Sequence, residues 1–116
     1  MINQIFVYGT LQRGQCRESL WPAAPLSVLK ATVRAKLFVR DDYPAIIEGE
    51  NPVHGELWTF EKETIHRVLR ELDQVEGCDQ PDLANLYDRV MIETSDPQGR
   101  PLGTAWTYFY ANDPAA

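Results

Sequence analysis

Alternating apolar and polar positions predict extended strands over much of this chain. Residues 2–8 are apolar at both alternating sets of positions, which is typical of a strand buried on both faces. Residues 29–39 alternate apolar with polar side chains, so we expect a strand with one buried face. Residues 53–60 suit a third strand, and Gly55 within it indicates a bulge or a close approach of another backbone segment.

The remaining extended segments are shorter or interrupted. Residues 40–52 hold two prolines and a glycine around a short apolar piece, which predicts a loop, a short strand and a turn. Residues 86–94 and 102–111 are rich in β-branched and aromatic side chains, and the turn-forming residues 95–101 separate them. We therefore expect these last two segments to pair as a hairpin.

One segment, residues 61–76, has the period of an amphipathic helix. Its apolar stripe consists of Ile65, Leu69 and Leu72. Glu61 and Glu63 suit the positive end of the helix dipole, and Gly77 suits the position after the last helical residue. Residues 16–21 are expected to form only a short helical turn.

About six strands and one or two helices are thus expected in a single domain spanning residues 1–116. The strands are not separated by regular helices, which argues against a doubly wound parallel sheet. We expect an α+β fold: a strongly curved or closed, mostly antiparallel sheet, with a helix covering part of it.

Glu76 departs from the apolar stripe of the predicted helix. At about 100° per residue, its side chain falls on the same face as the stripe. Either the helix ends after Leu72 and the acid turns to solvent, or a carboxylate is held against apolar surface. In the second case desolvation and the negative end of the helix dipole both raise its pKa, toward the range useful to a general base.

A second candidate feature is the loop that begins where the first strand ends. The chain breaks at Gly9 and continues as a short loop to Gly14. Consecutive backbone N–H groups in such a loop can cradle an anion, for example a carboxylate, provided that they point inward. Many strands end in a glycine turn, so this signal is weak when taken alone.

Charge and composition narrow the range of partners. The 116 residues carry 17 acids against 11 bases, a net charge of −6, which argues against nucleic acid and favours a small-molecule or protein partner. No apolar run approaches the roughly 20 residues that cross a bilayer, and no signal peptide is evident, so a cytoplasmic location is expected. Cys16 and Cys78 are expected to be free thiols, and no metal-binding motif is found.

Three segments together point to a known family. They are VYGTLQRGQ at 7–15, YPAIIEGENPVHGELW at 43–58 and LDQVEGC…LYDR at 72–89. In this order they resemble the γ-glutamylcyclotransferase-like family, and most closely its γ-glutamylamine cyclotransferase and AIG2-like branch. The resemblance implies a small mixed β-barrel flanked by helices. It also implies an enzyme without metal or organic cofactor, in which the substrate's α-amino group attacks its γ-carbonyl, releasing an amine and 5-oxoproline.

The resemblance also implies roles for particular residues. It puts Glu76 on the catalytic glutamate, as general acid and base. The loop that holds the substrate would comprise Tyr8, Gly9, Thr10 and Leu11. The family's Tyr-x-Arg spacing falls on Tyr87 and Arg89: either Tyr87 lines the pocket and Arg89 orients an acid, or they make an aromatic packing contact and a surface ion pair.

Three functions remain open from the sequence. The first is a cofactor-independent γ-glutamyl cyclotransferase acting on a γ-glutamylamine or related amide. The second is a non-catalytic small-molecule binding module on the same fold. The third is a pathway-specific enzyme that removes a γ-glutamyl protecting group, which shares the chemistry and differs in the leaving group. The identity of the leaving amine and the oligomeric state are not determined by these patterns.

Overall fold

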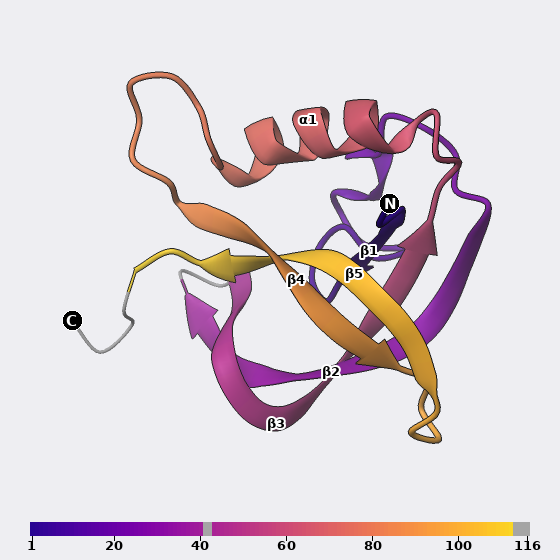
Figure 1. Ribbon diagram of the computed structural model, residues 1–116. Coiled ribbons are helices and arrows are strands. Elements are labelled where there is room, and N and C mark those ends of the chain that lie inside the picture. Colours follow the sequence, from indigo (N-terminus) through magenta and orange to yellow (C-terminus); the bar gives the residue numbers. More distant parts are fainter. Residues whose placement is uncertain (41–42, 113–116) are drawn as a thin grey trace.

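The computed structural model describes residues 1–40 and 43–112, which form a closed β-barrel with an α-helix lying across one end (Figure 1). The strands are β1 (Gln4–Val7), β2 (Ser27–Arg40), β3 (Tyr43–Thr59), β4 (Tyr87–Ser95) and β5 (Pro101–Tyr110). Their order around the barrel is β1-β3-β2-β4-β5. Only β1 and β5 pair in parallel, and the other neighbours are antiparallel. The expected α+β barrel is confirmed.

Among the described residues, the number of strands is five rather than six, because two predicted segments merge into β3. Residues 43–59 form one continuous strand, which pairs with β2 over 43–47 and 51–59. The predicted interruptions between 43 and 52 were therefore wrong, as was the separate start of a strand at 53. Residues 41–42, also expected in a loop, lie outside the described residues.

The geometry of the barrel explains why β3 tolerates its prolines. β1 pairs with β3 only over residues 56–59, so most of β3 has a ladder partner on one side only. Pro44 and Pro52 lie in that part. A proline has no N–H to donate, and here there is no second neighbouring strand that would need the donor. The register with β2 shifts between Ala35 and Lys36, and this irregularity accommodates the extra residues of β3.

The buried strand predicted at 2–8 corresponds to β1, and its two faces belong to two parts of the core. Ile5 and Val7 pack with the helix, whereas Phe6 packs inside the barrel. At Gly55 a Cβ atom would lie only 2.2 Å from the carbonyl oxygen of Val7. The expected close backbone approach at this glycine is therefore confirmed.

The helix α1 (Ile65–Glu76) begins four residues later than predicted. The preceding residues form a turn in which the N–H groups of Thr64 and Ile65 both donate to the carbonyl of Glu61. The helix continues through Glu76 and ends at Gly77, whose φ of 66° is left-handed. The alternative in which the helix ends after Leu72 is thus wrong.

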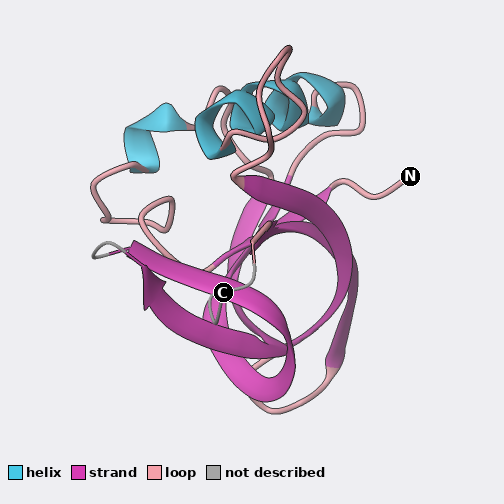
Figure 2. Ribbon diagram, turned by 90° about the vertical axis from the view of Figure 1, so that its left-hand side faces the viewer, coloured by secondary structure: helices cyan, strands magenta, loops and turns pink. Residues whose placement is uncertain are grey.

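The apolar face of α1 covers one end of the barrel, as the turned view shows (Figure 2). Ile65, Val68, Leu69 and Leu72 of this face are buried against β1, β3 and β5. The short 3₁₀ turn η1 (Glu18–Leu20) matches the helical turn expected at 16–21. Within the described residues, no helix has the length and apolar character needed to span a membrane.

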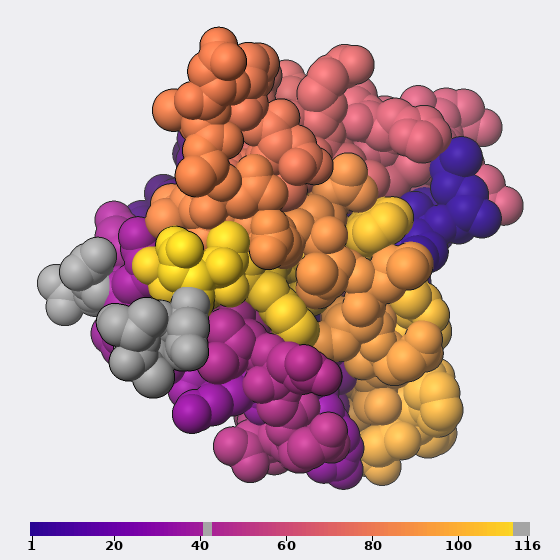
Figure 3. Space-filling view, turned by 60° about the vertical axis from the view of Figure 1, so that its left-hand side comes forward, coloured from indigo at the N-terminus to yellow at the C-terminus, as the bar shows by residue number. Residues whose placement is uncertain are grey.

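The predicted C-terminal hairpin is present as β4 and β5, paired from Tyr87 with Tyr110 to Ser95 with Pro101. The connection from α1 to β4, residues 77–86, projects from the surface beside the helix (Figure 3, orange). Its base is fixed because the N–H of Leu86 donates to the carbonyl of Gly77 at 2.9 Å. The start of β4 is therefore held close to the end of α1.

Candidate active site

A cavity of about 200 Å³ opens where the end of α1 meets β1 and the loop that follows it. Six of the seven residues predicted for the site line this cavity: Tyr8, Gly9, Thr10, Leu11, Glu76 and Tyr87. They come from segments that are far apart in the sequence and are brought together by closure of the barrel. Arg89, the seventh, is not among the lining residues.

Glu76 is the last residue of α1, and its side chain is only 13% exposed. Burial raises the pKa of this carboxyl, and the nearby guanidinium of Arg17 partly lowers it. The contact between Arg17 Nη2 and Glu76 Oε1 is long, at 3.5 Å. The acid therefore combines an apolar setting with one weak ion pair, and its pKa moves in the direction expected from the sequence.

The loop after β1 presents backbone amides without protein acceptors. Among the described residues, the N–H groups of Gly9, Thr10 and Leu11 donate no hydrogen bond within the chain, whereas their successor Gln12 donates to the carbonyl of Gly9 at 3.1 Å. The three amides belong to residues that line the cavity. They are therefore available to an anion or a polarised carbonyl in the cavity.

The far side of the same loop is held by side chains of the barrel. The N–H of Arg13 donates to Glu56 Oε1 at 2.9 Å, and Trp21 Nε1 donates to the carbonyl of Leu11 at 2.8 Å. Trp21 also stacks on Trp58, with ring centroids 4.2 Å apart. These contacts fix the loop without using the N–H groups of residues 9–11.

Neutral tyrosines form much of the cavity wall. Burial raises the pKa of Tyr8, and its hydroxyl donates to the carbonyl of Tyr108 at 2.9 Å. Burial also raises the pKa of Tyr87, with a further rise from the charge of Glu76. Tyr8 and Tyr87 therefore line the cavity in their protonated form at neutral pH, and they add hydrogen-bonding groups but no charge.

Arg89 belongs to a neighbouring cluster centred on Asp73. Its Nε and Nη2 donate to the two carboxylate oxygens of Asp73 at 3.0 and 3.4 Å. Its guanidinium lies over the ring of Trp106, 4.6 Å from the centroid. The hydroxyl of Tyr108 also donates to Asp73, at 2.6 Å. Arg89 thus orients an acid, but that acid is not Glu76.

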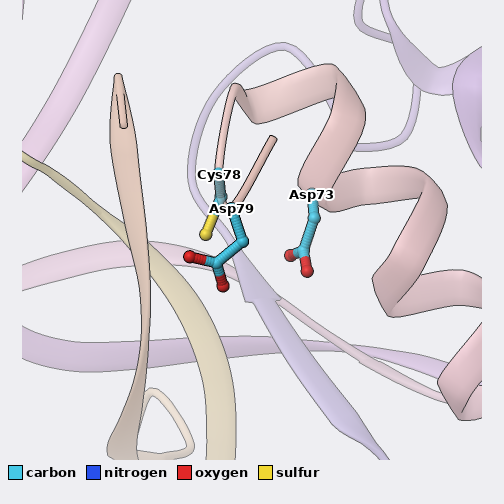
Figure 4. A group of neighbouring side chains, drawn as sticks. All are labelled: Asp73, Cys78 and Asp79. Atoms are coloured by element: carbon cyan, nitrogen blue, oxygen red, sulfur yellow. The ribbon is translucent and has the colours of Figure 1, made fainter. Parts of the chain in front are cut away.

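The Asp73 cluster also brings together three side chains that could ligate a metal. Ligand atoms of Asp73, Cys78 and Asp79 lie within 4.8 Å of one another, on the last turn of α1 and just beyond it (Figure 4). However, Arg89 already supplies positive charge to Asp73. Burial raises the pKa of the Cys78 thiol, which keeps it protonated. This donor set therefore does not favour a cation, and we assign no metal to it.

Two arginines of the cavity wall were not predicted from the sequence. Arg17 and Arg40 both line the cavity, together with Tyr43 and Pro44. Arg17 is 59 residues from Glu76 along the chain, so no local pattern could link the two. The only sequence signal was the proximity of Arg17 to the loop at 9–14.

The small closed barrel thus has one cavity in which a buried carboxylate, from the end of α1, lies beside a loop whose backbone amides have no acceptor in the described part of the chain. Comparison with known proteins gives the family. A model of the γ-glutamyl cyclotransferase, AIG2-like family matches residues 5–116, and the chain belongs to this family of enzymes.

Relatives of known name and structure agree with this membership. The chain is 32% identical over 111 residues to a γ-L-glutamyl-butirosin B γ-glutamyl cyclotransferase of Niallia circulans, covering 94% of this chain and 67% of that protein. It is 30% identical over 107 residues to the γ-glutamylcyclotransferase family protein YtfP of Escherichia coli, covering 92% and 81%. The crystal structure of an AIG2-like protein from Mus musculus shares the fold, with a TM-score of 0.74 at 22% identity, covering 98% and 81%.

Proposed function

We propose that this protein is a cofactor-independent γ-glutamyl cyclotransferase that converts a γ-glutamyl amide to 5-oxoproline and a free amine. Glu76 is the proposed general base and acid. The observation that carries the proposal is a single buried carboxylate of raised pKa in the same small cavity as three unpaired backbone amides. A pocket built only for binding would gain little from a desolvated acid.

The amides suit the electrostatic demands of this reaction. Attack on the γ-carbonyl places negative charge on its oxygen, and the substrate also carries an α-carboxylate. The N–H groups of residues 9–11 can donate to one of these oxygens, and either contact would favour the folded-back pose that ring closure needs. Tyr8 and Tyr87 are neutral, so they bring no further charge close to the substrate.

The proton balance explains why one carboxylate suffices. The α-nitrogen enters as ammonium, forms the new C–N bond and leaves as a lactam N–H, so it loses two protons. The departing nitrogen gains two protons as its bond to the γ-carbon breaks. Glu76 in its charged form would accept a proton from the first nitrogen and pass it to the second. No oxidant, reductant or second substrate is needed.

Tyr87 and Arg89, the two residues of the Tyr-x-Arg motif, have different proposed roles. Tyr87 is proposed to contact the substrate from the pocket wall. Arg89 is proposed to hold Asp73, rather than to bind substrate, because its guanidinium is engaged by that carboxylate and by Trp106. This assignment follows the alternative in which Arg89 orients an acid, and that acid is Asp73.

One relative favours a second candidate within the same chemistry. The Niallia circulans protein is named for a γ-glutamyl derivative of butirosin B, so a pathway-specific removal of a γ-glutamyl group is the alternative for this chain. The two candidates differ in the leaving group and not in the role of Glu76.

The test is product analysis with purified protein. A panel of γ-glutamyl-ε-lysine, simple γ-glutamylamines, γ-glutamyl dipeptides and glutathione would be assayed for 5-oxoproline. Release by the native protein and not by Glu76→Gln is expected. If a folded native protein released none from any substrate, the binding-module alternative or an untested specialised amide would be supported instead. Equal rates in both proteins would exclude Glu76 as the base.

A further inference from the structure

The loop that carries the free amides, residues 9–14, turns sharply because of the bonds within it. The carbonyl of Gly9 accepts a hydrogen bond from the N–H of Gln12 at 3.1 Å. The carbonyl of Thr10 accepts one from the N–H of Arg17 at 2.9 Å. In a planar trans peptide the N–H points away from the carbonyl of the same unit. The N–H groups of Thr10 and Leu11 are therefore directed away from these two local donors.

Two side chains from other segments attach this turn to the rest of the protein. Trp21 Nε1 donates to the carbonyl of Leu11 at 2.8 Å. Glu56 Oε1 accepts the backbone N–H of Arg13 at 2.9 Å. Neither Trp21 nor Glu56 is among the residues that line the cavity. Both contacts thus hold the loop from the side that does not face a substrate.

Trp58 joins these two side chains into one unit. Its Nε1 donates to the same Oε1 of Glu56 at 3.2 Å, and its ring stacks on Trp21 with the two planes only 10° apart. Trp58 is 3% exposed, so its position is set by the core. A carboxylate oxygen can accept from two donors, and its charge makes both bonds stronger than bonds to a neutral acceptor. The core therefore fixes Glu56 and Trp21, and these two fix the loop.

Such attachment matters for the proposed reaction. Backbone donors stabilise charge on a substrate oxygen only if they are already aligned when that charge develops. The loop ends at Gly14, whose φ of 79° lies in the left-handed region, so the loop contains a residue of high intrinsic freedom. Contacts from behind the loop remove that freedom without occupying the amides.

We propose that Glu56 and Trp21 are positioning residues of the active site, which act by holding the amide loop and not by contact with substrate. This inference rests on the proposed function. In it, the N–H groups of Thr10 and Leu11 hold a substrate oxygen, Glu76 moves the proton, and the pair behind the loop keeps the donors in line.

The first experiment removes the acceptor that holds the loop and measures 5-oxoproline release from the most active substrate of the panel. Glu56→Met should lower kcat/KM by about 10–100-fold, the cost of a small misplacement of binding groups. Glu56→Gln keeps an oxygen in the same place and should retain most of the activity. Glu50→Met, which removes an exposed acid of the same strand, is the matched control and should equal the native protein. So should Arg13→Met, which changes an exposed side chain and keeps the backbone N–H that Glu56 binds.

A second variant tests the other attachment and keeps the proposal open to refutation if Glu56→Met does not fold. Trp21→Phe removes the indole N–H and leaves a ring to stack on Trp58, and kcat/KM should fall by about tenfold. The pKa of Glu76 depends on its burial and on Arg17, so the acid limb of the pH profile should stay where it is in both variants. A moved limb would mean that the effect runs through Glu76, and would overturn the positioning role.

The order of the loop can be measured without turnover. Backbone ¹⁵N relaxation of residues 9–11 should give order parameters of about 0.85 in the native protein and in Glu56→Gln. Lower values are expected in Glu56→Met and Trp21→Phe. A purely stabilising role for the two side chains would lower the melting temperature and leave both the order parameters and the rate of the folded protein unchanged.

The outcomes separate the two proposals. Native rates in folded Glu56→Met and Trp21→Phe would overturn the inference and leave the proposed function intact. An equal loss in Glu56→Gln and Glu56→Met would also overturn it, because the charge rather than the acceptor would then matter. Absence of 5-oxoproline from the native protein with every substrate would overturn the proposed function instead. The relaxation data then decide the positioning: a loss of order in both variants supports it, and unchanged order rejects it.

Discussion

Two carboxylates, Asp73 and Glu76, lie three residues apart on α1 and differ in how fully they are partnered. Asp73 accepts two hydrogen bonds from Arg89 and a third from the hydroxyl of Tyr108. Within the described part of the chain, Glu76 accepts one hydrogen bond, from Arg17 at 3.5 Å. Their side chains are equally exposed, at 13% each. Burial therefore does not distinguish these two acids; their hydrogen-bond partners do.

Under the proposed function, one short helix carries both a structural acid, Asp73, and the proposed base, Glu76. The Asp73 network joins α1 to β4 and β5, and a satisfied network of this kind rigidifies the place where it lies. Burial raises the pKa of the weakly paired Glu76, which is the direction that suits a general base near neutral pH. Tyr108 connects the two regions, since its hydroxyl bonds Asp73 and its carbonyl accepts from Tyr8 in the cavity wall.

The largest expected effect is on catalysis at Glu76. Glu76→Gln keeps the shape of the side chain and removes the proton acceptor, so kcat should fall by about 10²–10⁴-fold. The measurement is the rate of 5-oxoproline release. Glu71→Gln, which changes an exposed acid of the same helix, is the control and should keep full activity. If Glu76→Gln and Glu71→Gln released 5-oxoproline at the same rate, Glu76 would not be the base. The difference between Asp73 and Glu76 would then have no bearing on catalysis.

The second effect is on stability at Asp73. Asp73→Asn leaves Arg89 without its anionic partner and weakens the bond from Tyr108, so the free energy of unfolding should drop by about 2 kcal/mol. Urea unfolding measures this. Tyr108→Phe, which removes one hydroxyl and keeps the ion pair, should cost less.

One pattern of results would exchange the roles given to Asp73 and Glu76. Loss of turnover without loss of stability in Asp73→Asn, together with full turnover in Glu76→Gln, would make Asp73 the reactive acid.

A third effect concerns the pH dependence of turnover. Glu76 must be ionised to accept a proton, so kcat/KM should fall as pH drops through its pKa. The guanidinium of Arg17 lowers that pKa, and Arg17→Met should therefore move the acid limb of the profile to higher pH. The profile of Arg13→Met should coincide with that of the native protein. A shift toward lower pH in Arg17→Met would contradict the electrostatic role given to Arg17.

The smallest effect is on the pH dependence of stability. Burial raises the pKa of Glu76 above its unfolded value of 4.5, so the native state binds this proton more tightly than the unfolded state does. Stability of the native protein should therefore decline as pH rises from the unfolded to the folded pKa, and Glu76→Gln lacks this decline. Unfolding free energies of both proteins, measured from about pH 4 to 8, should show a difference in favour of Glu76→Gln that grows with pH. A constant difference would mean that ionisation of Glu76 costs nothing in the folded protein.

Much of the architecture could be predicted from local patterns. An apolar run identified β1, alternation identified β2, and β-branched and aromatic residues around a turn identified the β4–β5 hairpin. The apolar stripe and Gly77 identified α1. The wrong predictions lie where strand pairing outweighed a local sequence signal. Prolines predicted breaks within 43–52, yet β3 runs through them because β2 pairs with it on both sides of the register shift at 48–50.

For the candidate site, the sequence pointed to Glu76 as an unusual acid, and the structure showed which residues contact it. The sequence alone determined that Glu76 falls in line with an apolar stripe of helical period and precedes a glycine, since period and capping depend on residues a few positions apart. The structure then decided that the helix continues through Glu76. Only the tertiary structure decided that Arg17 meets Glu76 and that Arg89 meets Asp73, across 59 and 16 residues of chain. Such pairings depend on how the barrel closes, and closure is a property of all five strands rather than of any one segment.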